Sequence, residues 1–203
     1  NVPVDEWKLD IVASGSQKGY MIPPGLSFIA MSQKAWEATE KSNLPKFYLN
    51  LQSYRKSLLS NSNPYTPAVN LIFALDEALK MMREEGLDNI FQRHNKHKLA
   101  MSNAVKALKL KLFADEKYLS PSITAIKTEN MNAEEFRKTI KNKFDILLAG
   151  GQDHLKGKIF RVGHLGYVSD RDIITVISAI SKTLFDLGEI TAQQAGEALV
   201  VAS

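Results

Sequence analysis

Strand-like and helix-like patterns alternate along the second half of the chain, and this alternation limits the fold more than any other feature. The predicted strands are short apolar runs, at 111–114, 123–127, 144–148 and 158–162. The predicted helices are amphipathic segments, at 132–142 and 169–187. Elements that alternate in this way are typical of α/β or α+β domains. We therefore expect a protein of the α/β class.

The first half opens with a strand, a loop, a turn, a second strand and a helix. Residues 7–13 alternate and then become apolar, which predicts a short strand. The sequence Pro-Pro-Gly at 23–25 predicts a turn, and 26–31 (LSFIAM) predicts a buried strand. Ser32 is a suitable N-cap for a helix over 33–41.

The middle of the chain predicts one long connection and two long helices. Residues 42–67 show little periodicity and many Asn, Ser, Pro and Tyr, so we expect an irregular segment. Helices are expected over 68–85 and 87–108, and Gly86 ends or bends the first of them. We place a domain boundary near Gly86.

The composition excludes several classes of site. The chain has 203 residues, of which 44% are hydrophobic and 24% charged, and it has no cysteine. Disulfides, thiolate metal sites, iron–sulfur clusters and cysteine nucleophiles are therefore excluded. The net charge is +4, and aromatic residues do not alternate with the basic residues in their densest stretch, 93–98. We therefore expect no nucleic-acid partner. No stretch has the roughly 18 apolar residues of a membrane span, so we expect a cytoplasmic protein with no membrane partner.

Lys18 is the candidate nucleophile. It follows the small-residue loop Ser14-Gly15-Ser16-Gln17 and lies between the two segments that predict buried strands. A lysine is usually a solvated surface residue. A lysine held in an apolar cleft, however, loses its proton more easily and becomes a nucleophilic amine.

The segment Ser14–Lys18, with Pro23-Pro24-Gly25 and LSFIAMS after it, resembles the cofactor-lysine segment of class V aminotransferases of the alanine–glyoxylate and serine–pyruvate group. The resemblance continues through Phe47-Tyr48-Leu49, Tyr65-Thr66-Pro67 and GKIFRVG at 157–163. It implies the fold of type I enzymes that use pyridoxal 5'-phosphate (PLP). Residues 1–85 would then be the C-terminal part of the large PLP-binding domain, and 86–203 a complete small α+β domain.

The resemblance also implies roles for four residues. Lys18 would form the Schiff base with PLP and act as the general acid and base of the proton shift, and Gln17 would bind the cofactor phosphate. Arg161 would bind the substrate α-carboxylate, because a guanidinium fork matches a carboxylate better than an ammonium does. The alternative for Arg161 is a surface salt bridge at a strand end.

Thr66 matches a threonine that reaches the cofactor phosphate of the neighbouring subunit, which implies a homodimer. The chain departs from the family beside it. The family often has a tyrosine three residues before this threonine, where the chain has Asn63. A tyrosine stands instead at Tyr65.

In the family, the aspartate that pairs with the pyridine nitrogen lies upstream of the lysine, before Asn1. The chain also begins without Met and enters a strand-like segment within a few residues. We therefore expect a fragment that lacks the N-terminal half of the site and is inactive by itself.

The expected activity of the full-length protein is transfer of an amino group from alanine or serine to glyoxylate or pyruvate. Some similar sequences are named small subunit of a soluble hydrogenase. The alternative is therefore a non-catalytic subunit or binding module of a redox complex, since no cysteine is present to hold a metal centre.

The histidines do not predict a metal site. His94 and His97 share a predicted helical face with lysines beside them, so we interpret them as part of a solvated face. His164 either lines the substrate cleft or is a hydrogen-bonded histidine at a strand end.

Overall fold

A computed structural model describes residues 2–129 and 131–202 of the chain. The chain divides into two compact units, residues 1–84 and 85–203, and each is described by itself. Within the described residues, no helix combines the length and the apolar character that crossing a bilayer requires.

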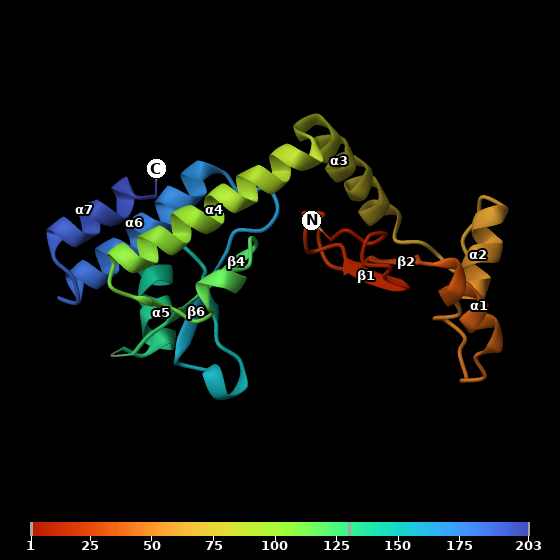
Figure 1. Cartoon of the computed structure of the whole chain (residues 1–203), viewed down its shortest axis with the longest axis horizontal. Coiled ribbons are helices and arrows are strands. Elements are labelled where there is room, and N and C mark those ends of the chain that lie inside the picture. Colours follow the sequence, from red (N-terminus) through yellow and green to blue (C-terminus); the bar gives the residue numbers. More distant parts are fainter. Residues whose placement is uncertain (1, 130, 203) are drawn as a thin grey trace. The chain divides into compact units, whose positions relative to one another are not determined.

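Among the described residues, the first unit contains one hairpin and three helices, which can be followed in Figure 1. Its elements are β1 (Ile11–Gly15), β2 (Ser27–Met31), α1 (Gln33–Lys41), α2 (Leu51–Leu59) and α3 (Val69–Glu85). The strands β1 and β2 are antiparallel, with Ile11 opposite Met31 and Gly15 opposite Ser27. The predicted second strand, first helix and long helix are confirmed within one or two residues.

Local hydrogen bonds explain where these elements begin. Ser32 caps α1 as predicted, because its hydroxyl accepts a hydrogen bond from the amide of Ala35. The first strand starts four residues later than predicted, since Trp7 lies in a turn and donates its amide to the carbonyl of Pro3. The helix α2 was not predicted, although Asn50 caps it by accepting from the amide of Gln52.

The prediction that both strands of the hairpin are buried is wrong for this chain. Ile11 is 61% exposed and Ile29 is 50% exposed. Apolar side chains predict a buried strand only where another layer covers them, and β1 pairs with β2 alone among the described strands.

The second unit is a four-stranded antiparallel sheet covered by helices. Its elements are α4 (Leu87–Ala107), β3 (Lys111–Leu112), a 3₁₀ turn (Glu116–Tyr118), β4 (Ile123–Lys127), α5 (Ala133–Phe144), β5 (Ala149–Gly150), a 3₁₀ turn (Asp153–Leu155), β6 (Ile159–Gly163), α6 (Asp170–Asp186) and α7 (Ala192–Val200). The strand order is β3-β4-β6-β5. This mixture of helices and sheets confirms the predicted α/β class.

The core of the second unit lies between one face of the sheet and the helices. Ile126 and Phe160 are opposite each other in β4 and β6, and both are fully buried. The helices α4, α6 and α7 contact one another, as Figure 1 shows, while α5 contacts β5, β6 and α6. Side chains of a strand alternate between its faces, so Arg161, next to Phe160, lies on the opposite face from this core.

One predicted strand of this unit is wrong, and one helix lies outside the predicted elements. The strand predicted at 144–148 is absent because α5 continues to Phe144 and ends at Asp145, whose backbone is left-handed (φ 55°). The strand that pairs with the outer edge of β6 is β5, which lies immediately after the predicted range. The helix α7 was not predicted, although Thr191 and Gln194 form a capping box at its start.

Candidate functional site

Lys18 lies on an exposed turn between β1 and β2. Its amide donates to the carbonyl of Gly15 over 3.1 Å, and its carbonyl accepts from the amide of Met21 over 3.1 Å. The expected apolar cleft around Lys18 is not formed by the flanking strands, because their residues are exposed or only half-buried. Among the described residues, no carboxylate forms an ion pair with Lys18, so its amine faces solvent.

Ser16 fixes the loop that carries Lys18. It is fully buried, and its hydroxyl donates to the carbonyl of Pro23 over 2.8 Å and accepts from the amide of Leu26 over 3.1 Å. Its amide donates to the carbonyl of Leu26 over 3.0 Å. These bonds close the ring of residues 16–26 at its base, so Lys18 projects from an anchored loop. Sequence reasoning named the loop but missed this role of Ser16.

Gln17 precedes Lys18 and is exposed. Its side chain folds back over Gly15, since a Cβ at Gly15 would lie 2.9 Å from Gln17 Oε1. Gln17 and Lys18 therefore share one turn, with the amide of Gln17 over the small residue that precedes the turn.

Thr66 is exposed in the loop just before α3. Its neighbour Tyr65 donates its hydroxyl to the carbonyl of Phe47 over 3.0 Å and packs against the rings of Phe47, Tyr48 and Tyr54. Tyr65 is thus committed to an aromatic cluster of the first unit.

Arg161 lies in β6, on the face of the sheet away from the core. Its neighbours across the ladder on this face are Ala125 and Ala149, which are small. Arg161 Nε donates to the carbonyl of Gly150 over 2.8 Å. No carboxylate of the described residues pairs with it, so these residues form no strand-end salt bridge with Arg161. A guanidinium held only through Nε keeps its two Nη groups free for a bidentate partner.

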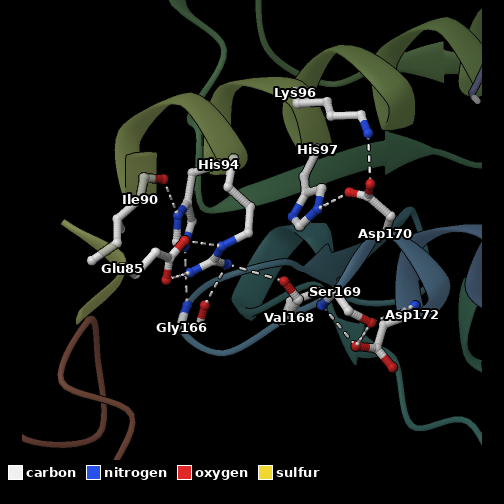
Figure 2. A network of polar contacts seen from close by, with 11 residues as sticks. Glu85, Ile90, His94, Lys96, His97, Gly166, Val168, Ser169, Asp170 and Asp172 are labelled. Atoms are coloured by element: carbon white, nitrogen blue, oxygen red, sulfur yellow. Dashed lines mark hydrogen bonds and ion pairs between the residues drawn. The ribbon is translucent and has the colours of Figure 1, made fainter. Parts of the chain in front are cut away.

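A polar network holds the loop between β6 and α6 (Figure 2). Arg93 Nη1 donates to the carbonyls of Gly166 and Val168, each over 3.0 Å. The same guanidinium donates two hydrogen bonds to the Glu85 carboxylate, from Nε to Oε1 over 2.6 Å and from Nη2 to Oε2 over 2.9 Å. The hydrogen bonds from Arg93 hold the pKa of Glu85 below its ordinary value, so this pair stays charged. His94 adds a bond of 3.2 Å from the Gly166 amide to its Nε2.

The interpretation of His94 and His97 as a solvated face is wrong. His97 is 1% exposed, and its Nε2 lies 2.9 Å from Asp170 Oδ1 (Figure 2). His94 is half-buried, and its Nδ1 donates to the carbonyl of Ile90 over 2.8 Å. Both imidazoles have structural partners on or after the β6–α6 connection.

His164 is the hydrogen-bonded strand-end histidine and is fully buried. Its Nδ1 donates to the carbonyl of Pro121 over 3.1 Å, and its Nε2 lies 2.9 Å from the hydroxyl of Thr124. Burial lowers the pKa of His164 from 6.5 to about 4, despite the opposing bond to Pro121. The neutral imidazole is therefore part of the fold.

The candidate residues are distributed over both units. Lys18 and Gln17 share the β1–β2 turn, and Thr66 precedes α3 in the same unit. Arg161 belongs to the second unit. The chain thus offers an exposed amine with an adjacent amide, and separately a guanidinium with a free fork.

Solved structures have the same fold. Ureidoglycine–glyoxylate aminotransferase from Bacillus subtilis is 29% identical, with a TM-score of 0.89 over 99% of this chain and 54% of that one. The fold is therefore that of the fold type I aminotransferases. The chain belongs to the aminotransferase class-V family, whose model matches residues 1–165.

Two curated relatives carry different names. A Synechococcus protein named "Soluble hydrogenase, small subunit" is 56% identical over 93% of this chain and 49% of its own length. A serine–glyoxylate aminotransferase from Methylorubrum extorquens is 35% identical over 91% of this chain and 48% of its own length. The chain spans about half the length of the curated relatives it matches.

Proposed function

We propose that the protein containing this chain is a PLP-dependent transaminase. It moves an amino group from a small amino acid, alanine or serine, to glyoxylate or pyruvate. Membership of the aminotransferase class-V family supports the reaction class. Two similar proteins both have glyoxylate in their names, which supports a small 2-oxo acid as the amino acceptor. In this proposal residues 1–85 belong to the large PLP-binding domain, and 86–203 form the small domain.

The observation that carries the proposal is the free fork of Arg161. Both the amino donor and the 2-oxo acceptor of a transaminase carry a carboxylate next to the reacting carbon. A guanidinium binds a carboxylate through two parallel hydrogen bonds, which fix its orientation as well as its position. Arg161 has its Nε fixed by Gly150 and stands between two alanines, so its Nη groups can take that carboxylate.

The residues of the first unit fit PLP. Lys18 offers a primary amine on an anchored turn, and Gln17 offers an amide that can donate to a phosphate. PLP, when bound, supplies an electron sink for the charge that develops at the substrate α-carbon. Lys18 Nζ removes the proton from that carbon and later returns one, while Arg161 keeps the carboxylate still. Because the chain spans about half the length of its relatives, the 203-residue chain alone is proposed to be inactive.

Thr66 is proposed to bind the cofactor phosphate of a neighbouring subunit in a homodimer. Its exposed position in a loop agrees with such a contact. Replacing Thr66 with Val keeps its shape and removes the hydroxyl. We expect weaker PLP binding in the Thr66→Val dimer, measured by equilibrium dialysis. If the unmodified full-length protein is a monomer in size-exclusion chromatography, the proposed contact between subunits is refuted.

The test of the whole proposal is covalent labelling of Lys18. The full-length protein is incubated with PLP, its absorbance spectrum is recorded, and it is reduced with borohydride and mapped by peptide mass spectrometry. We expect a phosphopyridoxyl group on Lys18, absent in Lys18→Ala and retained in Lys41→Ala, an exposed lysine of α1. Labelling spread equally over exposed lysines would contradict the proposal.

The second candidate is a non-catalytic subunit of a redox complex, which the name of the Synechococcus relative favours. The chain has no cysteine with which to hold a nickel or iron–sulfur centre. Its role in such a complex would therefore be binding. A full-length protein that takes up no PLP and copurifies with hydrogenase activity would favour this candidate.

A further inference from the structure

The orientation of Arg161 depends on one backbone carbonyl. Arg161 Nε donates to Gly150 O, and Gly150 lies in the two-residue strand β5 at the edge of the sheet. An edge strand of this length has only its partner strand on one side. The position of the two Nη groups of Arg161 therefore depends on the position of β5.

A charged pair on α5, Glu134 and Arg137, contacts the chain at β5. Arg137 Nε donates to the carbonyl of Leu148, just before β5, over 2.8 Å. Arg137 Nη1 donates to Glu134 Oε2 over 2.7 Å, one turn back on the helix. Their side chains are only 22% and 38% exposed, so the pair is partly shielded from water.

The same pair lies directly against Gly150. A Cβ on Gly150 would lie 2.5 Å from Arg137 Nη1 and 2.6 Å from Glu134 Oε1. Gly150 thus leaves room for the two side chains to touch its α-carbon, while its carbonyl faces Arg161. The contacts run without a gap from Glu134 through Arg137 and β5 to Arg161.

We propose that Glu134 and Arg137 are positioning residues, which orient Arg161 for the substrate carboxylate by fixing strand β5. The inference rests on the proposed function, in which Arg161 binds that carboxylate. Neither residue touches the substrate. Their effect on the reaction passes through the Gly150 carbonyl and the Arg161 fork.

The first test measures Arg161 directly in the 203-residue chain. The exchange of its Nε proton with solvent is followed by NMR, since a hydrogen-bonded N–H is protected. We expect exchange about tenfold faster in Arg137→Met and a smaller increase in Glu134→Gln. The matched controls are Lys138→Met and Glu135→Gln, the next residues of α5, which are exposed and should leave the rate unchanged. Equal rates in Arg137→Met and in the unmodified chain overturn the proposal.

The second test uses the full-length protein loaded with PLP. We expect Arg137→Met to raise KM for both the amino acid and the 2-oxo acid about tenfold, with kcat within about twofold. An amine substrate without a carboxylate should react equally well with both proteins. An equal loss with that amine would show general structural damage and overturn the proposal.

Arg161→Met separates this inference from the proposed function. If it raises KM while Arg137→Met and Glu134→Gln do not, the positioning role is wrong and the role of Arg161 stands. If Arg161→Met leaves KM unchanged, both are wrong. Thermal unfolding of each variant by circular dichroism shows that the comparison is between folded proteins.

Discussion

His97 on α4 and Asp170 at the start of α6 form a hydrogen bond of 2.9 Å between Nε2 and Oδ1, although the imidazole is 1% exposed and the carboxylate is largely solvated. Lys96 approaches the other oxygen of Asp170 at 2.5 Å. Among the described residues, no partner reaches His97 Nδ1. Asp170 is thus the only described side chain that bonds the buried ring.

Removing Asp170 should therefore cost more than removing Lys96. Asp170→Ala leaves the buried Nε2–H of His97 without an acceptor, and we expect a loss of about 1–3 kcal/mol in the free energy of unfolding. Lys96→Met removes only an exposed ion pair, and the expected loss is below about 1 kcal/mol. Urea unfolding at pH 7 measures both. Equal losses would contradict this account.

The effect of Asp170 should also depend on pH. The hydrogen bonds from Lys96 and His97 lower the pKa of Asp170 below 3.8. A carboxyl with a lowered pKa stabilises the fold above its unfolded pKa, and this contribution is lost as the pH falls through the folded value. The difference between the unmodified chain and Asp170→Ala should therefore be smaller at pH 3 than at pH 7.

His164 should weaken the fold in a different pH range. Its pKa falls from 6.5 in the unfolded chain to about 4 in the fold, mainly because it is buried. Between these values the unfolded chain binds a proton that the folded chain does not, so stability falls as the pH drops from 6.5 to 4. The full contribution is about 3 kcal/mol. Nearby His94 and His97 act in the same direction through their charge.

The variant His164→Asn isolates this effect, because an amide can donate to Pro121 but does not titrate. We expect the stability difference between the unmodified chain and His164→Asn to shrink steadily from pH 7 to pH 4, measured by urea unfolding. A constant difference over this range would show that His164 does not titrate as the fold implies.

Ser16 should control the order of the loop that carries Lys18. Ser16→Ala removes both bonds of the hydroxyl, to the exposed Pro23 and the half-buried Leu26, at about 0.5–1.5 kcal/mol for each bond lost. We expect faster hydrogen exchange at the Leu26 amide and slower labelling of Lys18 by PLP and borohydride. Ser14→Ala, in the adjacent strand, is the matched control and should leave both rates unchanged.

Local signals predicted the elements well where a cap or a turn residue marks them. Ser32 and Ser169 begin α1 and α6 through bonds that involve only the next three residues. The same kind of signal, at Asn50 and Thr191, was present for the two helices that were not predicted. Local capping residues therefore mark the starts of these two helices as well.

Burial and partners could not be predicted in the same way, because they depend on distant residues. His97 is buried, and its hydrogen-bond partner Asp170 is 73 residues away. The apolar pattern predicts a strand at 144–148 and not at β5 (Ala149–Gly150), so the bond from Arg161 to Gly150 has no basis in that pattern. The roles of Lys18, Gln17, Thr66 and Arg161 followed from resemblance to a family, and they stay predictions until they are measured.

The glycines around β5 should differ sharply in their tolerance of alanine. A Cβ at Gly151 would lie 2.1 Å from the carbonyl oxygen of Leu155, and a backbone atom cannot rotate away. A Cβ at Gly150 would meet the ends of flexible side chains, and a Cβ at Gly163 in β6 has nothing within 4 Å. Gly151→Ala should therefore lower the free energy of unfolding by at least about 2 kcal/mol, and Gly150→Ala should lower it by less. Gly163→Ala should change it by no more than about 0.5 kcal/mol.

Thermal and urea unfolding of the three variants give this order directly. Gly151→Ala should also speed exchange of the Arg161 Nε proton, because relieving the contact with Leu155 shifts the carbonyl of Gly150 that Arg161 binds. Gly163→Ala adds the same methyl group in the strand of Arg161 itself and should leave that exchange unchanged. If Gly151→Ala is as stable as Gly163→Ala, the turn after β5 does not constrain Arg161.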